Sequence, residues 1–281
     1  MLQRGYTRRK WISRLMLVLS GLATTIAILM LALVLGYTLV QGISYINLGF
    51  LTHASAPVGQ VGGGMRNEII GTIILVLLGS IIALPIGLMT GIFLAEFAGP
   101  RTAAAVRFAA DILAGVPSIV VGVFAYAILV RPLHSYSALS AGVALAIIMI
   151  PIIARTAEES LRLVPNHMRE AALALGITRW RAVLGVIVPG ALTGIVTGIM
   201  LGVARIAGET APLIFTALGS NFGFQSLLKP IGALPLQIYN YALSPYSDWK
   251  QQAWAGAFIL VLLVLGISIL VRWLSRRKGS R

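Results

Sequence analysis

Long apolar stretches separated by short polar segments dominate the pattern of hydrophobic and polar positions along this chain. A helix needs about 20 residues to cross the hydrocarbon core of a bilayer, so each stretch predicts a membrane-spanning helix. We predict six spans, at residues 15–40, 69–98, 108–130, 138–154, 184–207 and 254–274. The fold class is therefore an all-α integral membrane protein, and we expect residues 1–281 to form one transmembrane domain.

The stretch 210–245 is also partly apolar, but proline and glycine interrupt it repeatedly. Both residue types break helices. We therefore predict short re-entrant or surface helices here, on the outer side of the membrane. Irregular backbone is stable at membrane depth only where protein or water covers it.

The basic residues indicate the orientation. Seventeen of the 22 Lys and Arg residues lie at the two termini and in the loops 99–107 and 155–181. Because cytoplasmic segments carry an excess of Lys and Arg, we predict that both termini and both loops face the cytoplasm. The net charge of +14 follows from this distribution, and it argues against nucleic-acid binding because the basic residues flank apolar runs.

The composition limits the kinds of site that the chain can contain. Apolar residues make up 58% of the chain and charged residues 11%, whereas a soluble domain has about 25% charged residues. The chain has no cysteine, which excludes disulfides and thiolate metal sites. It also has no G-x-x-x-x-G-K-[ST] phosphate-binding loop, so we expect no ATP hydrolysis and no cofactor in this chain.

The most informative motif begins in the predicted cytoplasmic loop 155–181. That motif consists of Glu170, Ala171, Ala172, Gly176, Val186, Val188 and Pro189. Alanines let a short helix lie close to another protein, and glycine allows a sharp turn. We expect a helix with Asn166 as its N-cap and Gly176 at its end. Taken alone, the Glu-Ala-Ala triplet also fits an ordinary alanine-rich interfacial helix that has no partner protein.

The spacing from Glu170 to Pro189 resembles the signature of importer-type ABC permeases, with Val186 and Val188 where isoleucine and leucine are usual. In that family the segment is a coupling helix docked on a separate ATPase subunit. The resemblance implies that Glu170, Ala171, Ala172 and Gly176 couple this chain to the ATPase, which would bind ATP and Mg²⁺.

Two later segments, 204–218 and 235–239, are similar to the phosphate-importer permeases of this family. This resemblance implies a heterodimer with a second permease, two ATPase subunits and a soluble phosphate-binding protein outside a bacterial inner membrane. Other functions stay open. They are a permease for another oxyanion such as molybdate or sulfate, an ion-gradient-driven carrier, and a membrane scaffold that transports nothing.

A stripe of glycines marks the fifth predicted span. Gly190, Gly194, Gly198 and Gly202 recur at intervals of four, so they share one slowly turning face of a helix. Small residues at this spacing let two membrane helices approach closely. We predict that this face packs against another helix, in the same subunit or in a sister subunit.

Arg205 and Glu209 continue the glycine face and can pair with each other at i and i+4. Charges in a membrane segment are costly and usually face protein or water. Gly208 favours a break of the helix there. We expect the pair to lie in the substrate pathway. The alternative is a structural ion pair at the outer membrane edge.

Three further charged residues are candidates of lower rank. Arg155, at the cytoplasmic end of the fourth span, is either a pathway residue that attracts the leaving anion or a positive anchor of the helix. Glu96 and Asp111 flank the loop 99–107. We expect them to form structural ion pairs with Arg101 or Arg107.

Overall fold

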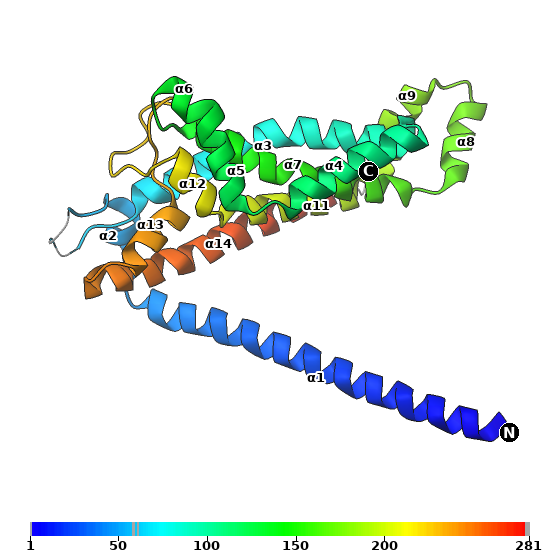
Figure 1. Ribbon diagram of the computed structural model, residues 1–281, viewed down its shortest axis with the longest axis horizontal. Coiled ribbons are helices and arrows are strands. Elements are labelled where there is room, and N and C mark those ends of the chain that lie inside the picture. Colours follow the sequence, from blue (N-terminus) through cyan, green and yellow to red (C-terminus); the bar gives the residue numbers. More distant parts are fainter. Residues whose placement is uncertain (1, 58–59, 61, 279–281) are drawn as a thin grey trace.

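A computed structural model of the chain shows a bundle of long helices with short helices at both ends (Figure 1). It describes residues 2–57, 60 and 62–278. Arg281, one of the basic residues used for the orientation, lies outside this set. The described residues form no β-strand and only two isolated bridges, Ser55 with Gly63 and Leu218 with Ile231, which confirms the all-α class.

Among the described residues, four helices are long and apolar enough to cross a membrane, or six if each of two bent pairs is one span. The four are α1 (Leu2–Ile43), α3 (Arg66–Ile92) with its continuation η1 (Phe93–Phe97), α7 (Ala138–Arg162) and α14 (Ser247–Lys278). The first bent pair consists of α4 (Pro100–Gly115), α5 (Ser118–Ala125), η2 (Tyr126–Val130) and α6 (Arg131–Leu133). The second consists of α9 (Arg179–Ala182), η3 (Val183–Ile187), α10 (Val188–Gly190) and α11 (Leu192–Ala207).

Two predicted spans are bent rather than continuous. The span predicted at 108–130 bends by 99° next to Pro117, because a proline disfavours the helical conformation in the residue before it. Accordingly, Val116 is extended, with a ψ of 129°. The span predicted at 184–207 bends by 72° at Ala191, shortly after Pro189.

The fourth span is longer than the predicted range 138–154. It forms α7, which continues to Arg162, so the polar and helix-compatible stretch 155–160 extends this helix beyond the predicted span. At its start, the Ser137 side chain caps the helix by accepting a hydrogen bond from the Ser140 N–H at 3.1 Å. Uncapped N–H groups at a helix start need a partner.

The stretch 210–245 contains the short helices α12 (Ala211–Thr216) and α13 (Leu234–Ala242), joined by irregular chain. That chain also supplies partners for the start of α7. Ala138 and Leu139 donate their N–H groups to the carbonyls of Lys229 and Leu227, at 3.0 and 2.9 Å. With α2 (Leu48–Thr52), these short helices occupy the end of the bundle opposite α8 (Figure 1).

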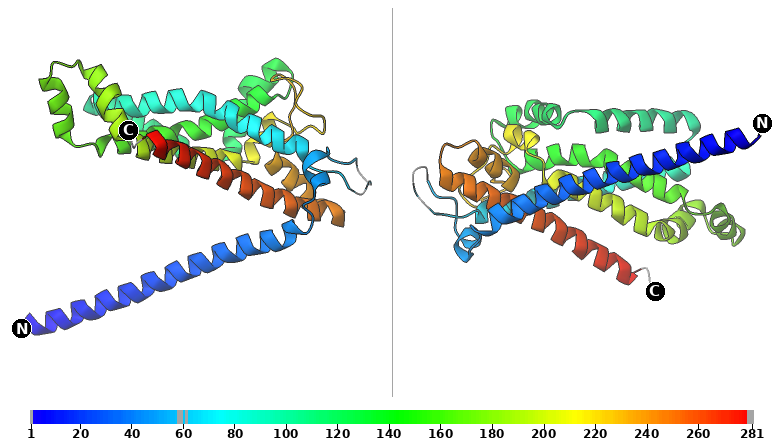
Figure 2. Two further views of the ribbon diagram at one scale, coloured as in Figure 1. Left: turned by 180° about the vertical axis from the view of Figure 1, so that it is seen from behind. Right: turned by 90° about the horizontal axis from the view of Figure 1, so that it is seen from below.

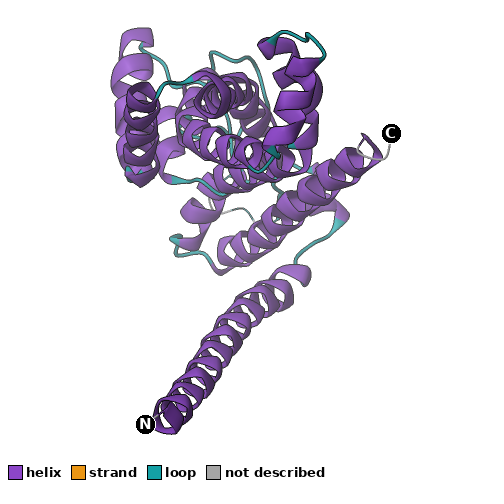
Figure 3. Cartoon of the chain, turned by 90° about the vertical axis from the view of Figure 1, so that its right-hand side faces the viewer, coloured by secondary structure: helices purple, strands orange, loops and turns teal. Residues whose placement is uncertain are grey.

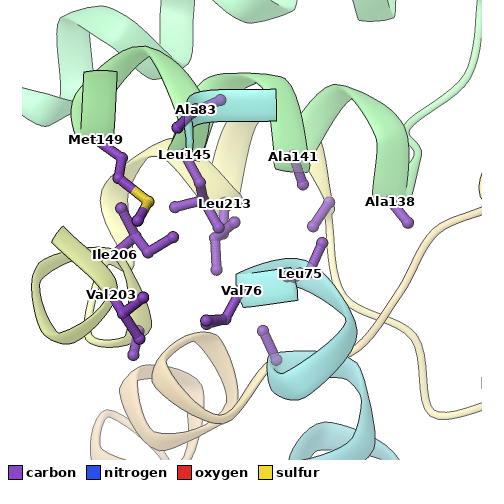
Figure 4. Close-up of a cluster of buried hydrophobic side chains, with 14 of the residues drawn as sticks. Leu75, Val76, Ala83, Ala138, Ala141, Leu145, Met149, Val203, Ile206 and Leu213 are labelled. Carbon is purple, nitrogen blue, oxygen red and sulfur yellow. The ribbon is translucent and has the colours of Figure 1, made fainter. Parts of the chain in front are cut away.

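The core lies between α3, α7 and α11 (Figure 4). Its buried side chains include Leu75, Val76, Ala83, Leu145, Met149 and Ile206. In contrast, α1 diverges from the bundle (Figures 2 and 3). Most of its apolar side chains are exposed. It meets α14 only towards its C-terminal part, where the rings of Tyr37 and Trp254 pack edge to face with centroids 5.1 Å apart.

The glycine stripe faces α7. Methyl groups added at Gly194 and Gly198 would overlap the side chains of Ser160 and Thr156 on α7. At Gly202 the added carbon would lie 3.0 Å from the Met149 side chain, and at Gly190 it would lie 3.7 Å from Val164. The stripe therefore brings α11 against α7 within the same subunit.

We expect Gly198→Ala to destabilise the protein, because the new methyl group must displace Thr156. Overpacking of this kind costs about 1–3 kcal/mol. Thermal unfolding in detergent should show a lower melting temperature. Gly185→Ala is the control, since a Cβ there meets nothing within 4 Å. Equal melting temperatures for the two variants would contradict the close packing of α11 on α7.

Candidate functional site

The predicted coupling segment forms a short helix, α8 (Asn166–Ala174), which projects from one end of the bundle (Figure 1). Pro165 is the N-cap and Asn166 is the first helical residue, so the expected capping role of Asn166 is wrong by one position. The Asn166 side chain instead accepts a hydrogen bond from Arg169 Nη1 at 3.2 Å.

Gly176 ends this helix through its backbone conformation. It has a φ of +75°, which favours glycine because other residues are strained there. The Gly176 N–H donates to the Leu173 carbonyl at 3.0 Å, and the Ile177 N–H donates to the Ala172 carbonyl at 3.3 Å. This pair of bonds is the Schellman motif, and it satisfies carbonyls that the helix end would leave unpaired.

The two faces of α8 differ. Glu170 and Ala171 are exposed, whereas Ala172 is buried and Met168 packs against the apolar cluster below. Leu175 beyond the helix is also 80% exposed. An exposed carboxylate beside exposed apolar side chains on a projecting helix suits contact with another protein.

Glu96 lies beneath α8 and pairs with Arg169 of that helix, a partner that the sequence did not reveal. Its side chain is 6% exposed and pairs with Arg169 Nη2 at 2.7 Å, so the expected pairing with Arg101 or Arg107 is wrong. Arg169 is 73 positions away in the chain, so no local spacing links the two residues. The only available signal was a carboxylate at the end of an apolar run, which requires a counter-ion.

A second charged cluster joins α4 to α7. Glu158 is 2% exposed and pairs with Arg107 at 2.7 Å and with Arg162 at 2.9 Å. Arg155 pairs with Asp111 at 3.1 Å and lies 3.8 Å from Glu158. The pairing expected for Asp111 is therefore also wrong, and two carboxylates already hold the pathway candidate Arg155.

Arg205 and Glu209 form an ion pair at 2.6 Å, with Glu209 5% exposed and Arg205 57% exposed. The adjacent Ile206 packs where Gly79 of α3 approaches Leu145 of α7, and both of these residues lie away from the ends of their helices. Arg205 therefore lies within the helical layer and not at its rim, which favours the pathway interpretation. Its exposed guanidinium has the planar donor geometry that binds oxyanions in bidentate fashion.

The two candidate pathway arginines lie at different depths. Gly198 on α11 contacts Thr156, which follows Arg155, whereas Gly202 contacts Met149. Arg205 lies seven positions beyond Gly198 in the sequence, about 10 Å further along a helix, on the side away from α8. The chain therefore presents two separate arginines along its length and not a single cluster.

The chain is similar to known proteins over most of its length. Residues 87–280 match the model of the "Binding-protein-dependent transport system inner membrane component" family. The chain belongs to this family. Among its curated relatives, the Yersinia pestis "Phosphate transport system permease protein PstA" is 41% identical over 98% of this chain and 93% of its own length. The Haemophilus influenzae protein of the same name is 41% identical, with 96% of each chain covered.

A more distant relative and two solved structures are also similar to the chain. The "Probable phosphate transport system permease protein PstA" of Methanocaldococcus jannaschii is 35% identical over 92% of each chain. A chain of the inward-facing MetNI methionine ABC transporter has a TM-score of 0.54 at 22% identity, covering 76% of this chain and 92% of its own. A chain of an amino acid ABC transporter also has a TM-score of 0.54, at 21% identity, covering 75% and 93%. These structures support the fold of this family member.

Within this family member, we expect Glu158→Gln to lower the stability of the fold. The amide keeps the shape of the side chain but leaves Arg107 and Arg162 without their shared counter-charge. Hydrogen bonds to charged groups contribute about 1.5–3 kcal/mol, so the free energy of unfolding should fall by a similar amount.

The neighbouring Glu159 is exposed, which makes Glu159→Gln the matched control. Chemical or thermal unfolding in detergent measures both variants. Similar stabilities for the two would contradict the proposed role of Glu158 as the shared counter-ion.

Proposed function

We propose that this chain is the permease subunit of an ATP-driven importer of inorganic phosphate and forms half of the translocation pathway. The observation that carries the proposal is the similarity to phosphate transport permeases over nearly the whole chain, at up to 41% identity. A permease does not hydrolyse ATP, so the motor is a separate polypeptide.

The proposed assembly has four kinds of component. This chain pairs with a PstC-like permease, and a PstB-like ATPase dimer binds ATP and Mg²⁺ on the inner side. A PstS-like binding protein delivers phosphate on the outer side, in line with the binding-protein dependence that the family description names. The exposed Glu170 and Ala171 on α8 supply the surface for the ATPase.

The proposed location is a bacterial inner membrane, with both termini and α8 in the cytoplasm. Two observations support this orientation. The Lys and Arg residues concentrate at the termini and in the loops on that side. The start of α1 and the end of α14 also lie towards the end of the bundle that carries α8 (Figure 1).

In the proposed mechanism, α8 moves with the ATPase subunits as they close on ATP. The following segment carries this movement into α11, whose glycine face holds it against α7. Arg205 offers positive charge to the passing anion, and Glu209 restrains the guanidinium so that phosphate does not remain bound. Transport requires binding that is weak enough for release.

Uptake of radiolabelled phosphate by vesicles that contain the reconstituted complex tests this function. We expect uptake only when ATP and the binding protein are present. Uptake without ATP would indicate an ion-gradient-driven carrier. Preferential uptake of sulfate or molybdate would indicate a permease for another oxyanion.

Arg205→Gln should reduce phosphate uptake by about tenfold or more, because the charged hydrogen bond from the guanidinium to the phosphate, worth about 1.5–3 kcal/mol, is lost. The complex should still assemble, because glutamine can donate a hydrogen bond to the Glu209 carboxylate in place of the guanidinium and the Arg205 side chain is itself more than half exposed. Arg131→Gln, which removes an exposed arginine of α6, is the control. Normal uptake by the Arg205 variant would remove this residue from the pathway.

A further inference from the structure

The underside of α8 is attached to the bundle through one buried carboxylate. Glu96 lies in the π-helical turn η1, where α3 ends. Arg169 of α8 donates to its carboxylate from Nη2 at 2.7 Å and from Nε at 3.1 Å. A π-helical turn is often found at functional sites. Here it places the carboxylate under the helix that faces the ATPase.

Arg169 joins three parts of the chain through its guanidinium. Besides Glu96, it donates to the carbonyls of Leu161 in α7 and Val164 beyond α7, at 2.8 and 2.5 Å. A lysine could not replace these contacts, because its three donors share one atom whereas the arginine donors are spread over a planar fork. Arg169 therefore links α8 to the ends of both α3 and α7.

Glu96 is also contacted by Arg179, which follows α8 in the sequence. The Arg179 guanidinium of α9 donates to the Glu96 main-chain carbonyl and lies over the Phe97 ring, 5.3 Å from its centroid. Arg169 and Arg179 precede and follow the Gly176 turn. The two ends of the segment thus contact the same residue of η1, one through its side chain and one through its backbone.

The surroundings of this contact are not densely packed. A hollow of about 210 Å³ lies beside it, lined by Glu96, Arg169 and Arg179 together with Leu173 and Val183. An apolar core is therefore incomplete on this side of α8. Where apolar packing is incomplete, the ion pair between Glu96 and Arg169 fixes the position of α8. Removing one partner of a buried ion pair is strongly destabilising.

We propose that Glu96, Arg169 and Arg179 form the joint through which movement of α8 reaches α3 and α7. The proposal rests on the proposed function, in which α8 docks on the ATPase. The three residues are positioning residues and do not touch phosphate. Because α3 extends along the bundle and packs against α7, a displacement of η1 changes the opposite end as well.

The test compares phosphate transported per ATP hydrolysed in reconstituted complexes. Glu96→Gln keeps the shape and removes the charge, so the ATPase should still co-purify while the transport-to-hydrolysis ratio falls about tenfold. Glu96→Asp keeps the charge and should retain more of the ratio than Glu96→Gln. If Glu96→Gln does not accumulate in the membrane, Arg169→Lys carries the test with the same expectation.

Exposed residues of the same types on the same side of the protein are the controls. Glu159→Gln and Arg101→Lys should leave the ratio unchanged. A wild-type ratio in Glu96→Gln would overturn the joint, and so would loss of the ATPase from the complex, which would make Glu96 a docking residue. Failure of the unmodified complex to transport phosphate would instead contradict the proposed function.

Discussion

The structure depends on the cost of placing a carboxylate in an apolar interior without a counter-ion. Glu96, Glu158 and Glu209 are each at most 6% exposed in their side chains, and each is paired with at least one arginine. A charge in a membrane segment is costly unless it faces protein or water. The pairs of Glu96 and Glu209 lie at helix ends, where α3 passes into η1 and just after α11, whereas the pair of Glu158 joins the interior of α7 to α4.

These pairs also organise the proposed mechanism along the chain. Glu96 holds the coupling segment to α3, and Glu158 holds α4 to α7. Glu209 holds Arg205 where α11 ends. Between Glu96 and Glu209, the glycine stripe keeps α11 against α7, and in the proposed mechanism the two helices move together. In that mechanism, the residues that satisfy buried charge connect the end of the bundle that carries α8 with Arg205.

Local patterns in the sequence predicted much of this arrangement. Apolar runs marked the long helices, and the spacing from Glu170 to Gly176 marked α8 and its glycine turn. The bend near Pro117 has a local cause in the proline itself. The extension of α7 to Arg162 takes in the polar residues 155–160, which the length of an apolar run does not include. The partners of Glu96 and Asp111 lie 73 and 44 positions away, and only the folded chain brings them together.

In the proposed assembly, we claim that α8 faces the cytoplasm and docks on a separate ATPase. The chain has no native cysteine, so Ala171→Cys introduces a single thiol on the exposed face of α8. A membrane-impermeant thiol reagent should label it in inside-out vesicles but not in right-side-out vesicles, and bound ATPase should protect it. Labelling from the outer side, or equal labelling with and without the ATPase, would contradict the claim.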